Sequence, residues 1–191
     1  MICILLVSLK KNIMKYRHVL PKRLASSLAV FISLFLLHHL MFRPWLLDWG
    51  APEELQQMRF SGDAFTSGEK HTRAVLINAS PDKIWPWLIQ LGQERAGFYS
   101  YELLENLFFA DMHNVYEIRP EFQIPRTVGD TIWLASKENY YGGGYQIFAE
   151  TTPLNSFVMV SDDDYVRVKN GEMARGSWAF YLHPRDSEST W

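Results

Sequence analysis

The 191-residue sequence contains a single cysteine, Cys3, and few basic side chains outside its N-terminus. One cysteine excludes a disulfide framework within the chain and a zinc site built from several thiolates. Six lysines and arginines fall within residues 1–23, so residues 24–191 hold 13 basic and 21 acidic side chains. Phosphate binding requires clustered positive charge, and this acidic balance therefore argues against nucleic acid as a partner.

The sequence also lacks the motifs of nucleophilic catalysis, metal binding and cofactor binding. It has no Ser-His-Asp order, no cysteine nucleophile and no cofactor fingerprint. Asp111 and His113 offer two ligands where a metal site needs three or four, so we expect an ordinary polar loop. The glycine run 142–144 precedes a strand rather than a helix N-terminus, and Asp162–Asp164 lacks calcium-loop spacing, so both are predicted to be turns. We predict no metal and no cofactor.

A hydrophobic stretch without a formally charged side chain runs from Leu24 to Phe42. As a helix its 19 residues would span about 28 Å, close to the hydrocarbon thickness of a bilayer. Trp45 and Trp49 follow at the position of an interfacial belt. A signal peptide would show a small-residue cleavage site after this stretch, and a soluble core helix would show a polar face. Neither is present, so we predict a transmembrane helix over residues 24–42.

The residues on either side of this helix predict its orientation and the start of the folded domain. The basic leader 1–23 predicts a cytoplasmic N-terminus and a domain on the opposite side of the membrane. Met1 and Met14 are both possible starts of the protein. Residues 43–70 contain scattered apolar residues and turn formers, which predicts a linker.

The region after residue 70 alternates between helix and strand signals. Ser80, Pro81 and Asp82 begin a helix that Gly92 ends, and residues 100–109 form a second helix. Strands are predicted over 72–78, 131–135, 145–150, 157–161, 165–168 and 177–182. This order predicts an α+β domain over residues 71–191, with helices packed on one antiparallel sheet.

Three segments of this region together resemble a known family. NASPDKIWPWLIQLGQERAGFYSYELLENL is followed by VGDTIWLA and later by GSWAFYL. These segments are similar to the SRPBCC superfamily, which includes START-like, Bet v 1-like and polyketide cyclase/dehydrase-like proteins. The resemblance covers the chain from about Thr72 to Leu182, and many members of the branch carry a hydrophobic N-terminal segment.

The resemblance implies a helix-grip fold. In such a fold a curved antiparallel sheet wraps a long C-terminal helix, encloses a deep apolar cavity, and has two short helices at one end. The family continues with a further strand and that helix at the point where this sequence stops, at Trp191. We therefore expect a fragment of a longer protein, or a domain that a partner chain or the membrane surface completes.

The stretch GQERAGFYSYELLENL supports two interpretations that the sequence leaves open. In the first, Tyr99 and Tyr101 fill space, while Arg95 and Glu105 form helix-end and surface ion pairs. In the second, the two hydroxyls orient an apolar ligand at a cavity mouth, and Arg95 binds an anionic group there. Glu105 is then a candidate general base. We also expect at least one of Trp133, Tyr145 and Trp178 to line the cavity.

These observations predict a membrane-anchored domain that binds a lipid or another hydrophobic small molecule. Two alternatives remain. One is a cyclase-, dehydratase- or hydrolase-type enzyme that acts on a hydrophobic substrate. The other is a structural or interaction module whose cavity is filled by its own aromatic side chains.

Overall fold

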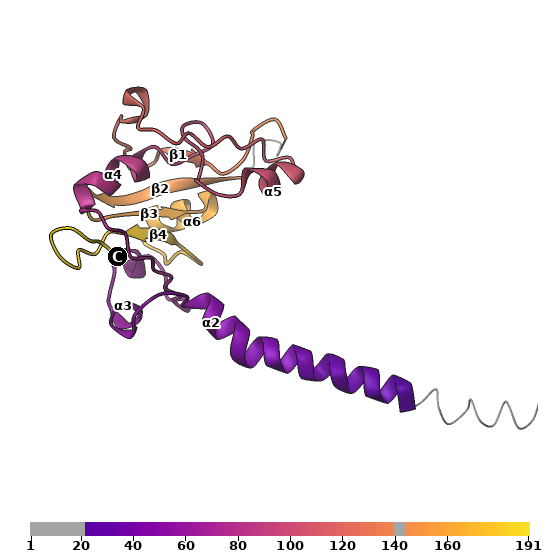
Figure 1. The fold of residues 1–191 in the computed structure, drawn as a ribbon. Coiled ribbons are helices and arrows are strands. Elements are labelled where there is room, and N and C mark those ends of the chain that lie inside the picture. The colour runs from indigo at the N-terminus through magenta and orange to yellow at the C-terminus, as the bar shows by residue number, and fades with distance from the viewer. Residues whose placement is uncertain (1–21, 140–143) are drawn as a thin grey trace, which may run out of the picture. The chain divides into compact units, whose positions relative to one another are not determined.

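The computed structural model describes residues 22–139 and 144–191 and divides the chain into two compact units, Met1–Trp49 and Gly50–Trp191 (Figure 1). In the first unit a continuous helix of 26 residues runs from Lys22 to Leu47. It includes the π-helical turn η1 (His38–Phe42) and the segment α2 (Arg43–Leu47). Its most apolar window has a mean hydropathy of 1.9, and none of that window is buried. The helix is therefore long and apolar enough to cross a membrane. Residues 1–21 of the predicted leader 1–23, which include Cys3 and Met14, lie outside the described residues.

The second unit contains a four-stranded antiparallel sheet in the order β1-β2-β3-β4 (Figure 1). The strands are β1 (Thr131–Trp133), β2 (Tyr145–Thr152), β3 (Ser156–Val160) and β4 (Trp178–Tyr181). All five residues of β3 are buried, which makes it the centre of the sheet. Met159 of β3 pairs with Phe148 on one side and with Trp178 on the other. Directly paired residues share a face, so these three side chains lie on the same side of the sheet.

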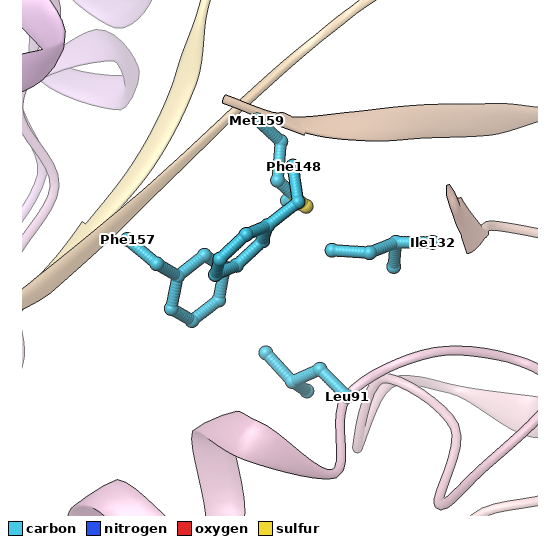
Figure 2. Close-up of a cluster of buried hydrophobic side chains, with 5 residues drawn as sticks. All are labelled: Leu91, Ile132, Phe148, Phe157 and Met159. Atoms are coloured by element: carbon cyan, nitrogen blue, oxygen red, sulfur yellow. The ribbon is translucent and has the colours of Figure 1, made fainter. Parts of the chain in front are cut away.

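The main hydrophobic core lies on that face. It consists of Leu91, Ile132, Phe148, Phe157 and Met159, each no more than 6% exposed (Figure 2). Helix α4 (Pro81–Ile89) packs Trp85 and Leu88 against this cluster. Pro81 at the first helical position and Asp82 in the first turn favour the helix start, as the sequence predicted. Ser80 occupies the N-cap without a capping hydrogen bond from its side chain.

Residues 50–70 pack against the edge of the sheet at β4 and belong to the compact second unit, although the sequence predicted a linker over 43–70. They contain α3 (Glu53–Gln57) and the 3₁₀ turn η2 (Ser61–Ala64). The hydroxyl of Tyr181 accepts a 2.6 Å hydrogen bond from the Gly62 amide, and its ring stacks on Phe60 at 4.1 Å. A Cβ at Gly62 would lie 3.1 Å from that of Ala179, so the absence of a side chain permits this close packing.

Two predicted strands are wrong. Residues 72–78 form no strand, because Ile77 makes only an isolated bridge to Thr190 and a strand requires a continuous neighbour. Residues 165–168 belong to helix α6 (Asp162–Lys169). The Ser161 side chain caps this helix by accepting a 3.2 Å hydrogen bond from the Asp164 amide, and three aspartates complement the dipole in its first turn. The predicted turn at Asp162–Asp164 is therefore the start of a helix.

The remaining short elements are α5 (Glu102–Leu107) and η3 (Pro120–Phe122). The prediction of an α+β domain with one antiparallel sheet is confirmed, and the sheet is open in the described part of the chain. The helix-grip arrangement stays a prediction.

Candidate ligand-binding site

The loop that follows α4 turns sharply beside the hydrophobic core. Gly92 and Gly97 pair across it, and their backbones adopt φ values of +128° and +75°. A Cβ at Gly97 would lie 2.4 Å from Oδ1 of Asn114, so this position requires glycine. The loop therefore brings residues 95–99 against the end of α4 and against residues 113–116.

A buried glutamine, Gln90, organises the polar part of this region. Its Nε2 donates to the hydroxyl of Tyr99 at 2.7 Å and to the carbonyl of Glu117 at 3.0 Å. Its Oε1 accepts from the Arg119 amide at 3.3 Å and from the Gln123 side chain at 3.2 Å. Gln90 is fully buried, so each of these bonds replaces water that the side chain has lost.

Tyr99 is held in a backbone conformation that bulky residues rarely adopt. Its φ is +56°, in the left-handed region, and its amide donates a 2.8 Å hydrogen bond to Oδ1 of Asn114. Its hydroxyl lies 3.5 Å from the Trp87 carbonyl, which is too far for a strong bond. Burial raises the pKa of Tyr99, against the opposing effect of the Gln90 hydrogen bond. The hydroxyl therefore keeps its proton at neutral pH, and the long contact to the Trp87 carbonyl leaves its hydrogen only weakly bonded.

Four partly buried aromatic side chains pack against the core: Trp85, Phe98, Tyr99 and Phe180. We call these four, together with the exposed Trp178 on the core face of the sheet, the aromatic rim. Phe98 stacks on Trp178 with centroids 5.9 Å apart, and Trp178 contacts Phe180 at 5.2 Å. Trp178 is 45% exposed, so the rim presents flat apolar surface to the outside.

Arg95 has a structural set of contacts. Its Nη1 donates to the carbonyls of Ile89, Phe122 and Ile124 at 3.0–3.1 Å. Ile89 is the last residue of α4, so the guanidinium satisfies a carbonyl that the helix end leaves unpaired. Burial and the positive charge of Arg126 lower the pKa of Arg95. These contacts hold the guanidinium at the end of α4 by hydrogen bonds to backbone carbonyls rather than by the ion pairs of the first interpretation.

Tyr101 is the N-cap of the neighbouring helix α5, and Glu105 lies within that helix. Tyr101 is 79% exposed. Oε2 of Glu105 is buried, with no hydrogen-bond partner among the described residues. The structure therefore brings Arg95 and Tyr99 to the end of α4 but does not place Tyr101 in the same group.

Trp133 and Tyr145 pair directly, with ring centroids 5.0 Å apart. Ile132 points into the core, so its neighbour Trp133 and the paired Tyr145 lie on the opposite face. The ammonium of Lys137 lies 4.3 Å from the Trp133 ring, and the negative charge of Asp162 raises the pKa of Tyr145. Of the three aromatics selected from the sequence, Trp178 alone belongs to the aromatic rim.

The sequence analysis missed the two amides that position Tyr99. Gln90 interrupts the apolar run IWPWLIQL, and a polar residue at such a position indicates a buried hydrogen-bond centre. Asn114 has no comparable signal, because its partners Tyr99 and Ser100 lie 15 and 14 residues away along the chain. Arg126, whose side chain is 6% exposed, was also missed; it pairs with Glu94 at 2.9 Å and holds the loop to β1.

Two surface hollows accompany these elements. One of about 310 Å³ has Trp178 in its wall, together with Gln146, Ser161, Asp164, Gly176 and Ser177. The other, of about 560 Å³, is lined by polar residues at 78–83 and 185–189. Asp111 and His113 pair at 3.3 Å on the surface, and no group of three metal ligands occurs in residues 22–139 and 144–191. Neither hollow is an enclosed apolar cavity.

Comparison of the chain with protein-family models, with curated proteins and with solved structures gives no match. The similarity to the SRPBCC superfamily therefore stays a prediction drawn from the sequence segments.

Proposed function

We propose that the chain is a membrane-anchored domain that binds a lipid or another hydrophobic small molecule at the aromatic rim. The observation that carries this proposal is the geometry of Tyr99. A non-glycine residue in the left-handed region costs free energy, on the order of 1–3 kcal/mol, and such residues cluster at functional sites. Here Gln90 and Asn114 hold that residue with its ring in the rim and its hydroxyl oriented.

The composition of the rim favours an apolar ligand with one polar group. Stacked aromatic rings bind flat or aliphatic surfaces, and one hydroxyl fixes the orientation of the molecule. The helix Lys22–Leu47 favours attachment to a membrane, where such ligands are dissolved. The predicted cytoplasmic N-terminus would place the domain on the far side of that membrane.

A second candidate is an interaction module that binds another protein rather than a small molecule. The burial of the core favours it, because Ile132, Phe157 and Met159 of the main core cluster are at most 3% exposed and are covered by side chains of the domain itself. In this case a partner chain would cover the rim.

Photolabelling of the full chain in membranes tests the proposed function. Photoactivatable fatty acid and sterol probes are crosslinked in membranes that contain the protein, and labelled peptides are located by mass spectrometry. We expect label in residues 85–99 and 178–180, in addition to label that bilayer lipid deposits in the helix 22–47. Label in the helix alone would contradict binding at the rim.

Conservative variants distinguish the contribution of the Tyr99 hydroxyl to ligand binding from that of its ring. Tyr99→Phe should lower rim labelling by roughly fivefold, because one hydrogen bond contributes about 1 kcal/mol. Tyr101→Phe is the matched control, since that tyrosine is exposed and lies outside the rim. An equal loss of rim labelling in both variants, or no loss in Tyr99→Phe, would show that the Tyr99 hydroxyl does not contribute to ligand binding.

A further inference from the structure

The segment Tyr101–Phe109, which contains α5, has its apolar side chains on the outside. Six of its nine residues are large hydrophobic residues that are at least 56% exposed: Tyr101, Leu103, Leu104, Leu107, Phe108 and Phe109. A surface helix of a globular domain normally turns this kind of face toward the core. We call these six residues the α5 apolar surface.

The polar side chains of the same segment bond back to their own domain. Oε1 of Glu102 accepts a hydrogen bond from the Asn114 amide. Asn106 accepts from the Met112 amide at 2.5 Å and donates to the Met112 carbonyl at 2.9 Å. Oε2 of Glu105 is buried as well. The polar positions therefore fix the segment to residues 112–114, and this attachment turns the apolar positions outward.

Left-handed backbone residues flank the segment on both sides. Tyr99 precedes it with a φ of +56°, while Phe109 and Asp111 end it with φ values of +63° and +53°. Such conformations are unfavourable for bulky residues and persist only where the surroundings impose them. These residues change the direction of the backbone at each end of the segment, and the Phe109 side chain stays exposed.

We infer that the α5 apolar surface inserts into the interfacial region of the bilayer. Exposed leucine, phenylalanine and tyrosine side chains are suited to the boundary between headgroups and acyl chains. Residues 96–112 contain no lysine or arginine, so the surface offers no cation to an acidic protein or to an anionic headgroup. The hydrocarbon of a lipid requires no such charge.

Covalent connection to a helix that can cross a membrane favours the bilayer over other occupants. The helix Lys22–Leu47 would confine the α5 apolar surface near the same bilayer, which raises its effective concentration there. A protein partner would have to compete with that lipid. The inference shares membrane attachment with the proposed function and is independent of any ligand at the aromatic rim.

Site-specific fluorescence on the full chain in phosphatidylcholine nanodiscs tests this inference. Single cysteines replace Leu34, Leu104 or Met173 in a Cys3→Ser background, and each is labelled with a polarity-sensitive dye. Met173 is the control, an exposed apolar residue outside the α5 apolar surface. We expect quenching by doxyl-labelled lipid and a blue-shifted emission at residues 34 and 104, and neither at residue 173.

The results at residues 34 and 104 distinguish a failure of this inference from a failure of membrane attachment. Quenching at 34 without quenching at 104 would overturn the inference and leave membrane attachment intact. A blue shift at 104 without lipid quenching would show a protein partner or a second copy on this surface, which also overturns it. Absence of quenching at 34 would refute membrane attachment, and with it this inference.

Paired substitutions test the apolar character of the surface directly. Leu103→Glu together with Leu107→Glu should abolish quenching at residue 104 and leave quenching at residue 34 unchanged. Both leucines are more than two thirds exposed, so the substitutions leave the core intact. Unchanged quenching at 104 in this variant would contradict insertion driven by these side chains.

Discussion

The side-chain amide of Gln90 donates a 2.7 Å hydrogen bond to the hydroxyl of Tyr99. This bond joins the end of α4 to a tyrosine whose backbone is strained and whose ring belongs to the aromatic rim. The orientation of the hydroxyl therefore depends on a side chain that is fully buried. A buried amide that is fully bonded fixes a single arrangement, and its loss should affect stability and ligand binding together.

Gln90→Met should destabilise the second unit by about 2–4 kcal/mol, because methionine fills the volume but leaves the Glu117 carbonyl and the Arg119 amide without their partner. The measurement is the shift of the thermal midpoint of the full chain in detergent micelles. Gln57→Met is the matched control, since Gln57 is exposed on α3 and its loss should change stability by less than about 0.5 kcal/mol. Equal thermal midpoints for the two variants would show that the hydrogen bonds of Gln90 do not stabilise the second unit.

Gly97→Ala should destabilise the protein by about 2–4 kcal/mol more than Gly171→Ala. Both glycines have positive φ values, +75° and +78°, so both variants carry about 1–2 kcal/mol of backbone strain. A Cβ at Gly97 meets Oδ1 of Asn114 at 2.4 Å, whereas one at Gly171 meets nothing within 4 Å. The difference between the two melting shifts measures the clash alone, and similar shifts would show that the loop relaxes without cost.

Asp164 should make stability depend on pH in the acidic range. Burial raises the pKa of its carboxyl, but hydrogen bonds from Arg175 and Ser161 outweigh burial and lower the pKa below its usual 3.8. A depressed pKa means that the stabilisation is present above 3.8 and is lost as the pH falls through the lower folded-state value.

Unfolding measured from neutral to acidic pH should therefore show that the stability difference between wild type and Asp164→Asn shrinks as the solution becomes more acidic. Asp163→Asn is the control, because Asp163 is 82% exposed although it also pairs with Arg175. A difference that stays constant with pH would refute the assigned cause.

The sequence predicted elements whose signals are local. Pro81 and Asp82 begin α4, and the strand predicted over 157–161 corresponds to β3 (Ser156–Val160). The strand predicted over 165–168 was wrong because Tyr165, Val166 and Val168 favour a strand by composition, while the cap at Ser161 favours a helix. The strand propensity of these side chains is outweighed by a capped helix start with three aspartates in its first turn.

The candidate site was predictable only in part, since its contacts join distant segments. Tyr99 and Trp178 were identified as aromatic candidates, and both belong to the rim. Their arrangement depends on Asn114, 15 residues after Tyr99, and on stacking between Phe98 and Trp178, 80 residues apart. The outward direction of α5 was also unpredictable, because helical spacing in YELLENLFF indicates an ordinary core-facing helix.

Membrane attachment and orientation give a separate prediction. In bacterial host cells the full chain should stay in the membrane pellet after washing with alkaline carbonate, because the helix Lys22–Leu47 would span the bilayer. In a Cys3→Ser background, Met173→Cys should react with an impermeant maleimide in intact cells, since the basic leader predicts a cytoplasmic N-terminus. Release by carbonate would refute the anchor, and reaction only after lysis would reverse the orientation.

Native mass spectrometry of the full chain, extracted from cell membranes in a mild detergent, tests whether the aromatic rim binds an apolar molecule. We expect a discrete complex of one chain with one apolar molecule. Trp178→Ala should lose this complex, because it removes the most exposed ring of the aromatic rim. Trp49→Ala, outside the rim, should retain it. A wild-type chain without a bound molecule, or a complex that Trp178→Ala retains in full, would contradict ligand binding at the aromatic rim.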